Sequence, residues 1–254
     1  MNEFESNVKL LNVCIVIPTY NHAPLLEGVI QDCLQYPIDI IVVNDGSTDN
    51  TLSIINKFEN QITQVSYLKN RGKGYALKQG AKKALALGYK AIITIDSDGQ
   101  HLASDIETLL VAATQNPNAI IVGSRILVHE NMPKKSTFAN KLSNFWFWVH
   151  TSLNIPDTQS GFRYYPLPCF QKKIWFTNRY NFELEILVRN VWCGIRVISI
   201  PIHVFYAPVG IRITHFKPFL DFIRISVLNT FLTIFALIYF YPKRFILKIM
   251  RLLA

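Results

Sequence analysis

Two carboxylates and an amide oxygen occupy alternate positions in the segment Asp96-Ser97-Asp98-Gly99-Gln100. The segment directly follows the apolar run Ala91-Ile92-Ile93-Thr94-Ile95, which has the composition of a buried strand. Hard oxygen ligands clustered in this way suit a divalent cation such as Mg²⁺ or Mn²⁺ that also holds substrate phosphates. An ordinary solvated acidic turn after a strand has the same composition. The five residues alone leave a metal site and a plain turn both open.

The elements that must position these residues alternate between strand-like and helical patterns. The predicted strands are Val13–Ile17, Ile38–Asn44, Val65–Leu68, Ala91–Ile95 and Ala119–Gly123. Helical spacing of apolar residues predicts helices over 25–34, 52–58, 75–87 and 106–113. This alternation predicts an α/β fold with an open, mostly parallel sheet flanked by helices. In such sheets, ligands bind beyond the carboxyl ends of the strands.

Each predicted strand is followed by a polar cluster. The five clusters are Pro18-Thr19-Tyr20-Asn21, Asp45-Gly46-Ser47-Thr48-Asp49, Asn70-Arg71-Gly72-Lys73-Gly74, Asp96-Ser97-Asp98-Gly99-Gln100 and Ser124-Arg125. Because the carboxyl ends of parallel strands meet at one edge, these groups should share a single rim. A rim this consistent favours a ligand site over five unrelated turns, and it favours metal binding by the acidic cluster.

A nucleoside-diphosphate-sugar is a ligand that such a rim could hold. A cation on Asp96, Asp98 and Gln100 would bridge its diphosphate, and Asp45 could accept hydrogen bonds from the base or ribose. Lys73 lies between two glycines that allow close approach to phosphate, although no Walker A sequence occurs here. Fork-shaped donors for phosphate oxygens come from Arg125, Arg163 and Arg212, each of which is equally compatible with a surface ion pair.

Together these motifs resemble family 2 glycosyltransferases, and within them the polyprenyl-phosphate (dolichol-phosphate mannosyltransferase-like) branch. The resemblance covers roughly residues 12–205 and rests on the five clusters together with Val43-Asn44, His101, Gly123 and Ser160-Gly161-Phe162-Arg163. It implies a GT-A fold, a sugar-nucleotide donor, a divalent metal and inversion at the anomeric carbon. It also implies the site residues: Asp96, Asp98 and Gln100 as metal ligands, Asp98, Arg125 and Arg163 as catalytic residues, and Pro18, Tyr20, Asn21, Asp45, Lys73, Asp96 and Arg212 around the donor.

In that branch the acceptor is a lipid phosphate whose own oxygen attacks the sugar. Because this nucleophile is already anionic near neutral pH, positioning and charge neutralisation matter more than a strong base. Arg125 and Arg163 fit the acceptor phosphate. The stretch Gly210–Phe216 resembles the region that closes over the donor diphosphate, but it offers Arg212 and His215 where the branch more usually has a lysine-containing pattern.

Two other functions remain open at this stage. The same fold could transfer sugar to a saccharide or lipid hydroxyl, which needs a general base, and Asp157, Glu183 and Glu185 are the candidates. Alternatively, the chain could be a sugar-nucleotide-binding scaffold without turnover. Nucleic-acid binding is not expected, because the positive charge of the tail is interleaved with aliphatic residues and no recognition motif occurs.

The C-terminal part predicts contact with a membrane surface. Residues 205–254 carry seven Lys or Arg against one acidic residue, and Ile225–Tyr241 is uncharged over 17 residues. That stretch could be a core helix, a marginal span or an interfacial helix, and the basic apolar tail after it suits anionic lipid. We expect a catalytic domain over residues 1–215, with an amphipathic or interfacial helix at 136–155, and a membrane-associated helical segment over 216–254.

The location of the catalytic part follows from its termini and cysteines. The N-terminus lacks a basic region or a signal-like apolar stretch, so we expect the catalytic part on the cytoplasmic face. The four cysteines are scattered without a close pair, which favours buried thiols over disulfides or a zinc site. The aromatic run Phe145-Trp146-Phe147-Trp148 fits either deep core or a belt at a bilayer.

Overall fold

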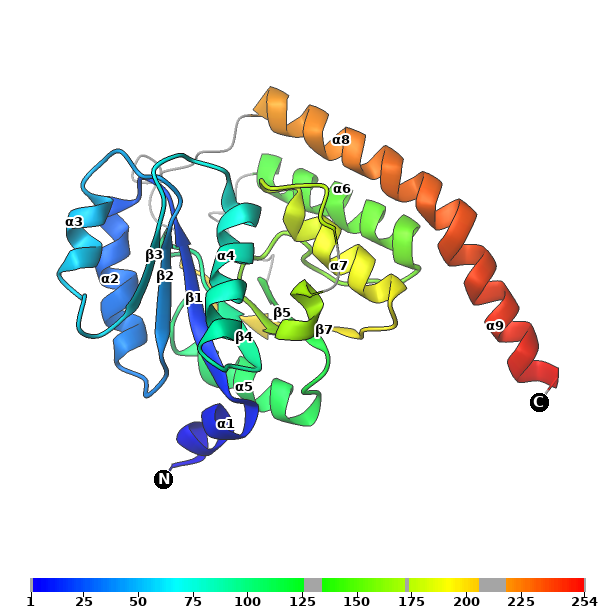
Figure 1. The fold of residues 1–254 in the computed structure, drawn as a ribbon. Helices are drawn as coiled ribbons and strands as arrows, with labels where there is room; N and C mark the ends of the chain where they lie inside the picture. The colour runs from blue at the N-terminus through cyan, green and yellow to red at the C-terminus, as the bar shows by residue number, and fades with distance from the viewer. Residues whose placement is uncertain (1, 126–133, 172–173, 206–217, 254) are drawn as a thin grey trace.

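The computed structural model describes residues 2–125, 134–171, 174–205 and 218–253 (Figure 1). Its centre is a seven-stranded sheet in the order β3-β2-β1-β4-β6-β5-β7. The strands are β1 Val13–Thr19, β2 Ile40–Asn44, β3 Thr63–Ser66, β4 Ala91–Thr94, β5 Ile120–Arg125, β6 Arg163–Pro166 and β7 Val197–Ile202. Strands β1 to β4 are mutually parallel, β6 runs antiparallel to β4 and β5, and β7 is parallel to β5. The predicted open, mostly parallel α/β sheet is confirmed.

Helices cover both faces of this sheet (Figure 1). They are α1 Glu3–Leu11, α2 Ala23–Leu34, α3 Thr51–Asn56, α4 Lys73–Ala86, α5 Asp105–Gln115, α6 Lys134–Thr151, α7 Phe182–Trp192, α8 Pro218–Phe235 and α9 Tyr241–Leu253. A short 3₁₀ helix, Leu167–Phe170, follows β6, and a π-helical turn, Ala236–Phe240, joins α8 to α9.

The period-two alternation of the strands divides the core into two apolar layers. In β1, Ile15 and Ile17 pack toward α1, α2 and α5, whereas Cys14 and Val16 pack toward α4 and α7. This is the behaviour expected of strands covered on both faces, and it explains why their sequences read as continuous apolar runs. Cys14, Cys33 and Cys169 are buried and Cys193 is exposed, so the predicted burial of the thiols holds for three of the four cysteines.

The C-terminal elements form one continuous helix, Leu220–Met250, of 31 residues. Its length and composition would suffice to cross a bilayer. Of its apolar 18-residue stretch, 22% is buried against the rest of the protein. In Figure 1, α8 lies along α6 and α9 projects past the body of the molecule. The buried residues Leu228, Leu232 and Ala236 recur every four positions and form one docked face of this helix. The predicted domain boundary at residues 215/216 lies outside the described residues.

The aromatic run of α6 divides between the core and the exposed surface. Phe147 is fully buried in the core layer beside Leu228 and Leu232, whereas about half of Phe145 and Trp148 is exposed. Helical spacing explains this division, because four consecutive residues of a helix cannot all face the same side.

Candidate functional site

The carboxyl ends of the parallel strands form one edge of the sheet, which we call the rim. Because β6 is antiparallel to its neighbours, its amino end lies at this same edge, with Arg163 opposite Thr94 of β4. The segment before β6, residues 156–161, is therefore brought beside the acidic cluster after β4; we call it the 156–161 turn. The predicted convergence of polar strand ends is thus present, with one additional contributor.

The 156–161 turn touches the acidic cluster at Gly161. A Cβ atom added to Gly161 would lie 2.3 Å from Oδ2 of Asp96, far inside van der Waals contact. The Thr94 hydroxyl also donates a hydrogen bond to the Gly161 carbonyl at 2.7 Å. Only glycine fits here without displacing the carboxylate, so the turn and Asp96 are fixed relative to one another.

Lys73 links Asp96 to Glu183 through two ion pairs. Its Nζ lies 2.7 Å from Oδ1 of Asp96 and 2.9 Å from Oε1 of Glu183. Burial acts to raise the pKa of Asp96, but the charge and hydrogen bond of Lys73, together with the nearby His101 and Arg163, outweigh burial and hold that pKa below its usual range. Burial likewise acts to lower the pKa of Lys73, and the two carboxylates instead raise it. The predicted donor-binding pair Lys73 and Asp96 is thus brought together, fully charged.

The oxygen donors at the rim fit a divalent cation that takes some ligands from its substrate. Asp96 and Asp98 are half-buried, and Oδ1 of Asp98 accepts a hydrogen bond from the Gln100 backbone N–H at 3.1 Å. Gly99, between Asp98 and Gln100, has φ +69°, a conformation that glycine adopts freely. Within the described residues, no three His, Cys, Asp or Glu side chains form a metal-binding group. The two rim carboxylates, Asp96 and Asp98, match Mg²⁺ or Mn²⁺ chemistry, in which one or two carboxylates share the ion with water and phosphate.

Asp45 uses its carboxylate to hold the loop before α4. It accepts hydrogen bonds from Asn70 Nδ2 at 2.9 Å, the Arg71 N–H at 2.8 Å and the Gly72 N–H at 2.7 Å. The residue is 2% exposed. The sequence-based expectation was a direct contact with the base or ribose, whereas this geometry gives Asp45 a role in shaping the loop that carries Lys73.

The first polar cluster is tied to the second. Asn21, at φ +50°, receives a hydrogen bond from the Thr48 N–H at 2.8 Å on its Oδ1, and its own N–H donates to Ser47 Oγ at 3.0 Å. Pro18 lies within β1, in register with Val43, and Tyr20 is half-buried just beyond the strand. All three predicted donor-side residues therefore lie at the rim, with Asn21 engaged in holding two loops together.

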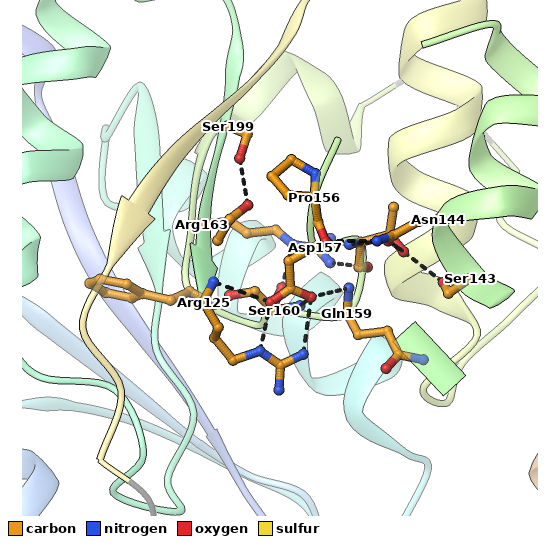
Figure 2. Close-up of polar contacts among 12 residues, drawn as sticks. Arg125, Ser143, Asn144, Pro156, Asp157, Gln159, Ser160, Arg163 and Ser199 are labelled. Carbon is orange, nitrogen blue, oxygen red and sulfur yellow. Dashed lines mark hydrogen bonds and ion pairs between the residues drawn. The ribbon is translucent and has the colours of Figure 1, made fainter. Parts of the chain in front are cut away.

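Arg125, at the end of β5, forms an ion pair with Asp157 of the 156–161 turn (Figure 2). Arg125 Nε donates to Oδ2 at 2.6 Å and its NH2 group donates to Oδ1 at 3.0 Å, a two-pronged pairing. Asp157 is fully buried and also accepts from the backbone N–H groups of Gln159 and Ser160. The Arg125 side chain is 11% exposed, so only a small part of it reaches the surface of the rim, and the pairing fixes its orientation.

Arg163 does not fit its predicted contact with an acceptor phosphate. It is fully buried, and its guanidinium donates to the carbonyl oxygens of Ser160 at 2.6 Å, Thr158 at 2.9 Å and Glu183 at 3.0 Å, and to the Tyr165 hydroxyl at 2.7 Å. These donations occupy the guanidinium inside the protein. Arg163 instead fastens the 156–161 turn to the first turn of α7, which carries Glu183.

Two contributors to the rim had no assigned role in the sequence interpretation. His22 Nδ1 lies 3.1 Å from Ser97 Oγ, which joins the loop after β1 to the acidic cluster. Tyr180 is half-buried near Lys73, Asp96 and Glu183, and burial raises the pKa of its hydroxyl to about 12. His22 directly follows the Pro18–Asn21 cluster, so proximity in sequence was an available signal; no periodic pattern marks Tyr180. Arg212 and His215 lie outside the described residues.

A family model described as glycosyl transferase family 2 matches residues 14–183, a range that includes all the rim residues named above. The chain belongs to glycosyltransferase family 2. It is therefore an enzyme of the sugar-transferring class with a GT-A-like fold, and the family expected from the sequence motifs is confirmed.

Curated relatives of this family 2 chain include lipid-phosphate glycosyltransferases. UDP-N-acetylglucosamine–dolichyl-phosphate N-acetylglucosaminyltransferase of Methanococcus voltae is 30% identical over 59% of this chain and 68% of its own length. The dolichyl-phosphate β-glucosyltransferase of Drosophila melanogaster is 27% identical over 70% of this chain and 62% of its own, so this chain spans less than two thirds of the fly enzyme.

Solved structures share the fold at low sequence identity. Glucosyl-3-phosphoglycerate synthase from Mycobacterium tuberculosis superposes with a TM-score of 0.61 at 18% identity, covering 92% of this chain and 81% of that one. S. aureus TarS (residues 1–349), with a TM-score of 0.57 and 16% identity, covers 87% of this chain and 66% of that one. These neighbours support the GT-A-like architecture.

Proposed function

We propose that this enzyme moves a hexose from a nucleoside-diphosphate-sugar to a polyprenyl phosphate, with inversion and with the help of Mg²⁺ or Mn²⁺. The names of the M. voltae and fly relatives specify dolichyl phosphate, a polyprenyl phosphate, as their acceptor. The M. voltae name specifies a UDP-sugar, and the mycobacterial synthase was crystallised with Mn²⁺ and UDP-glucose. A UDP-sugar is therefore the first donor to test.

The observation that carries the choice of acceptor is the engagement of all three candidate general bases. Asp157 is fully buried on Arg125, and Glu185 is fully buried on Arg189 and on the backbone N–H groups of Phe176 and Thr177. Glu183 pairs with Lys73 at 2.9 Å. A hydroxyl acceptor needs a base that is free to take its proton, whereas a phosphate acceptor is already anionic. The described rim favours the phosphate.

The chemistry then consists of positioning two phosphate-bearing substrates. An acceptor phosphate oxygen forms a bond to the anomeric carbon from the face opposite the donor diphosphate, and the bond from that carbon to the diphosphate oxygen breaks. Arg125 orients the acceptor phosphate, and Lys73 adds positive charge near the departing diphosphate. A divalent cation on Asp96, Asp98 and Gln100 would supply further charge neutralisation for the leaving group.

We also propose that the enzyme works at a membrane surface, with its catalytic part on the cytoplasmic face. The C-terminal helix exposes large apolar residues along its whole length: Phe222, Ile223, Val227, Phe231, Ile234, Phe235, Leu237, Ile238, Tyr239, Phe245, Ile246, Leu247, Ile249 and Met250. Phe145 and Trp148 of α6 are also about half exposed. An apolar face of this extent supports docking in lipid, where a polyprenyl acceptor resides.

An acceptor panel tests the proposal. Purified protein is incubated with Mn²⁺, labelled UDP- and GDP-sugars, and either undecaprenyl phosphate or undecaprenol, its hydroxyl counterpart. We expect labelled glycolipid from the phosphate alone. Transfer only to undecaprenol would support the hydroxyl-acceptor alternative. Nucleotide binding that needs no metal, without product from any acceptor, would support the scaffold alternative, and either result would overturn the proposal.

A further inference from the structure

The side-chain amide of Asn144, in α6, bonds to the 156–161 turn through both its nitrogen and its oxygen (Figure 2). Its Nδ2 donates to the Pro156 carbonyl at 2.7 Å. Its Oδ1 accepts from the Thr158 N–H at 2.9 Å and from the Thr158 hydroxyl at 2.7 Å. These contacts bracket Asp157 on both sides, so one side chain fixes the backbone immediately before and after that carboxylate.

Asp157 in turn determines where the Arg125 guanidinium lies. Both of its oxygens pair with Arg125, and the Arg125 backbone N–H adds a third contact, at 3.3 Å, to Oδ2. The carboxylate is fully buried, so it cannot follow a shifted guanidinium into solvent. If the turn moves, Asp157 moves, and the direction in which Arg125 faces the rim changes with it.

We propose that Asn144 is a positioning residue for the acceptor side of the site, acting through Asp157 on Arg125. The inference rests on the proposed function, in which Arg125 orients the acceptor phosphate. Within the part of the chain that the structure describes, the Asn144 amide bonds to the turn at Pro156 and Thr158 and not to Lys73 or Asp96. The Gly161 end of the turn, which touches Asp96, is held separately by the Thr94 hydroxyl. Donor binding should therefore depend on Asn144 much less than acceptor binding does. A residue that merely stabilised the fold would not separate the two substrates in this way.

The first measurement follows Arg125 itself and does not depend on which acceptor is used. In protein labelled with ¹⁵N-arginine, the Arg125 Nε–H signal is assigned by its loss in Arg125→Lys. We expect Asn144→Leu to shift this signal and to speed its exchange with solvent. Asn144→Asp, which keeps the acceptor for Thr158 and loses the donor to Pro156, should have an intermediate effect. Asn116→Leu removes a half-buried amide that donates to the Ala112 carbonyl of α5, away from Arg125 in sequence and in contacts among the described residues, and should leave the signal unchanged.

The second measurement is a double-mutant cycle on transfer kinetics. Asn144→Leu should raise the KM for undecaprenyl phosphate about ten-fold while the KM for the sugar nucleotide changes less than about two-fold. In the Arg125→Lys background, Asn144→Leu should add less than about two-fold, because the residue through which it acts is already altered.

Three results would overturn the inference. They are an unchanged Arg125 signal in Asn144→Leu, a rise in donor KM as large as the rise in acceptor KM, and full additivity with Arg125→Lys. Absence of transfer to any polyprenyl phosphate by the wild-type enzyme would instead reject the proposed function. The Arg125 signal would still decide whether Asn144 positions that residue.

Discussion

The acidic cluster is constrained at the level of single atoms, because Asp96 has a cation on one side and a glycine on the other. Lys73 neutralises the carboxylate at 2.7 Å, and Gly161 leaves just enough room for it. A carboxylate held in this way has one orientation available for a metal and a diphosphate. Catalytic groups displaced by as little as about 1 Å can lose about two orders of magnitude in rate.

Gly161→Ala should therefore lower activity far more than stability. The new methyl group would meet Asp96 Oδ2 at 2.3 Å, so the carboxylate must move away from Lys73. We expect about a hundred-fold loss of transfer, and a matching loss of Mn²⁺-dependent UDP-sugar binding measured by calorimetry.

Gly28→Ala is the matched control for that substitution. Gly28 lies inside α2 with nothing within 4 Å of an added Cβ, so the same change should preserve activity and raise stability by up to about 1 kcal/mol. Wild-type metal-dependent binding in Gly161→Ala would mean that the turn relaxes around the methyl group and does not fix Asp96.

Asp45→Asn should lose stability and nucleotide binding together. The carboxylate accepts from three donors, and an amide in its place would direct its own N–H₂ at one of them. Leaving a buried donor unsatisfied costs about 1–3 kcal/mol, which urea unfolding would detect. Calorimetry should also show weaker UDP binding, because the loop that carries Lys73 would be displaced. Full stability with lost UDP affinity would favour the direct nucleotide contact expected from the sequence.

At the scale of elements, periodicity and strand-end chemistry predicted the first half of the sheet well. Each end of β1, β2, β4 and β5 lies within two residues of its predicted position. Strand β3 is shifted as a whole, because it begins and ends two residues earlier than predicted. Strong β-branched runs with helices between them explain this success. The rim followed for the same reason, because parallel strands place their polar ends together.

The elements that the sequence interpretation missed lack such a signal or carry one that is easily overlooked. Strand β6 has only four residues, Arg163–Pro166, and begins with the arginine that the sequence interpretation assigned to the acceptor phosphate. Its antiparallel position between β4 and β5 is set by tertiary packing. Helix α1 did carry a readable signal, since Asn2 and Glu5 form a reciprocal capping box. The pairing of Arg125 with Asp157 joins residues 32 positions apart and has no periodic signature.

Helix α6 joins the C-terminal helix to the 156–161 turn. His150 Nε2 lies 3.1 Å from Thr233 Oγ1 of α8, and the His150 carbonyl accepts from Trp192 Nε1 at 2.8 Å. His150 is fully buried, and its ring stacks on Trp146. The docking of α8 on α6 therefore contains a titratable group with no exposure to water.

The stability of this docking should fall in mild acid. Burial lowers the pKa of His150 from 6.5 to about 4. Between these values the unfolded chain binds a proton that the folded protein does not, so the free energy of unfolding falls as pH drops from about 6.5 to 4. At about 1.4 kcal/mol per pH unit, this group contributes up to about 3 kcal/mol of that loss.

His150→Gln isolates the contribution, because it removes the titration and keeps a polar group beside Thr233. Urea unfolding at pH 7, 6 and 5 should give a shallower loss of stability for the variant than for the wild type. Carboxylates that titrate in the same range affect both proteins equally. Equal pH dependence in the two proteins would show that His150 becomes protonated without cost.

At the scale of the whole molecule, charge and apolar surface lie at the same end. Helix α9 exposes Lys243, Arg244 and Lys248 among its apolar residues, whereas 16 of the 17 acidic residues of the chain precede residue 205. A basic amphipathic helix next to the exposed apolar residues of α8 should bind anionic lipid in two ways, by burying apolar side chains and by electrostatic attraction to the headgroups. Only the electrostatic attraction should weaken as the salt concentration rises.

Replacing Lys243, Arg244 and Lys248 together by glutamine should therefore weaken binding to vesicles that contain anionic lipid. Each basic residue near such a surface contributes about 1 kcal/mol, so the triple variant should lose about 3 kcal/mol, or about two orders of magnitude in partitioning. Sedimentation with vesicles at 50 and 500 mM salt measures the effect, which should shrink at high salt. The control removes three exposed lysines from the catalytic body, Lys9, Lys82 and Lys90, with the same loss of net charge. If both triple variants weaken binding equally, net charge and not the C-terminal helix directs the protein to lipid, and the acceptor must then reach the rim without α9 anchoring the enzyme.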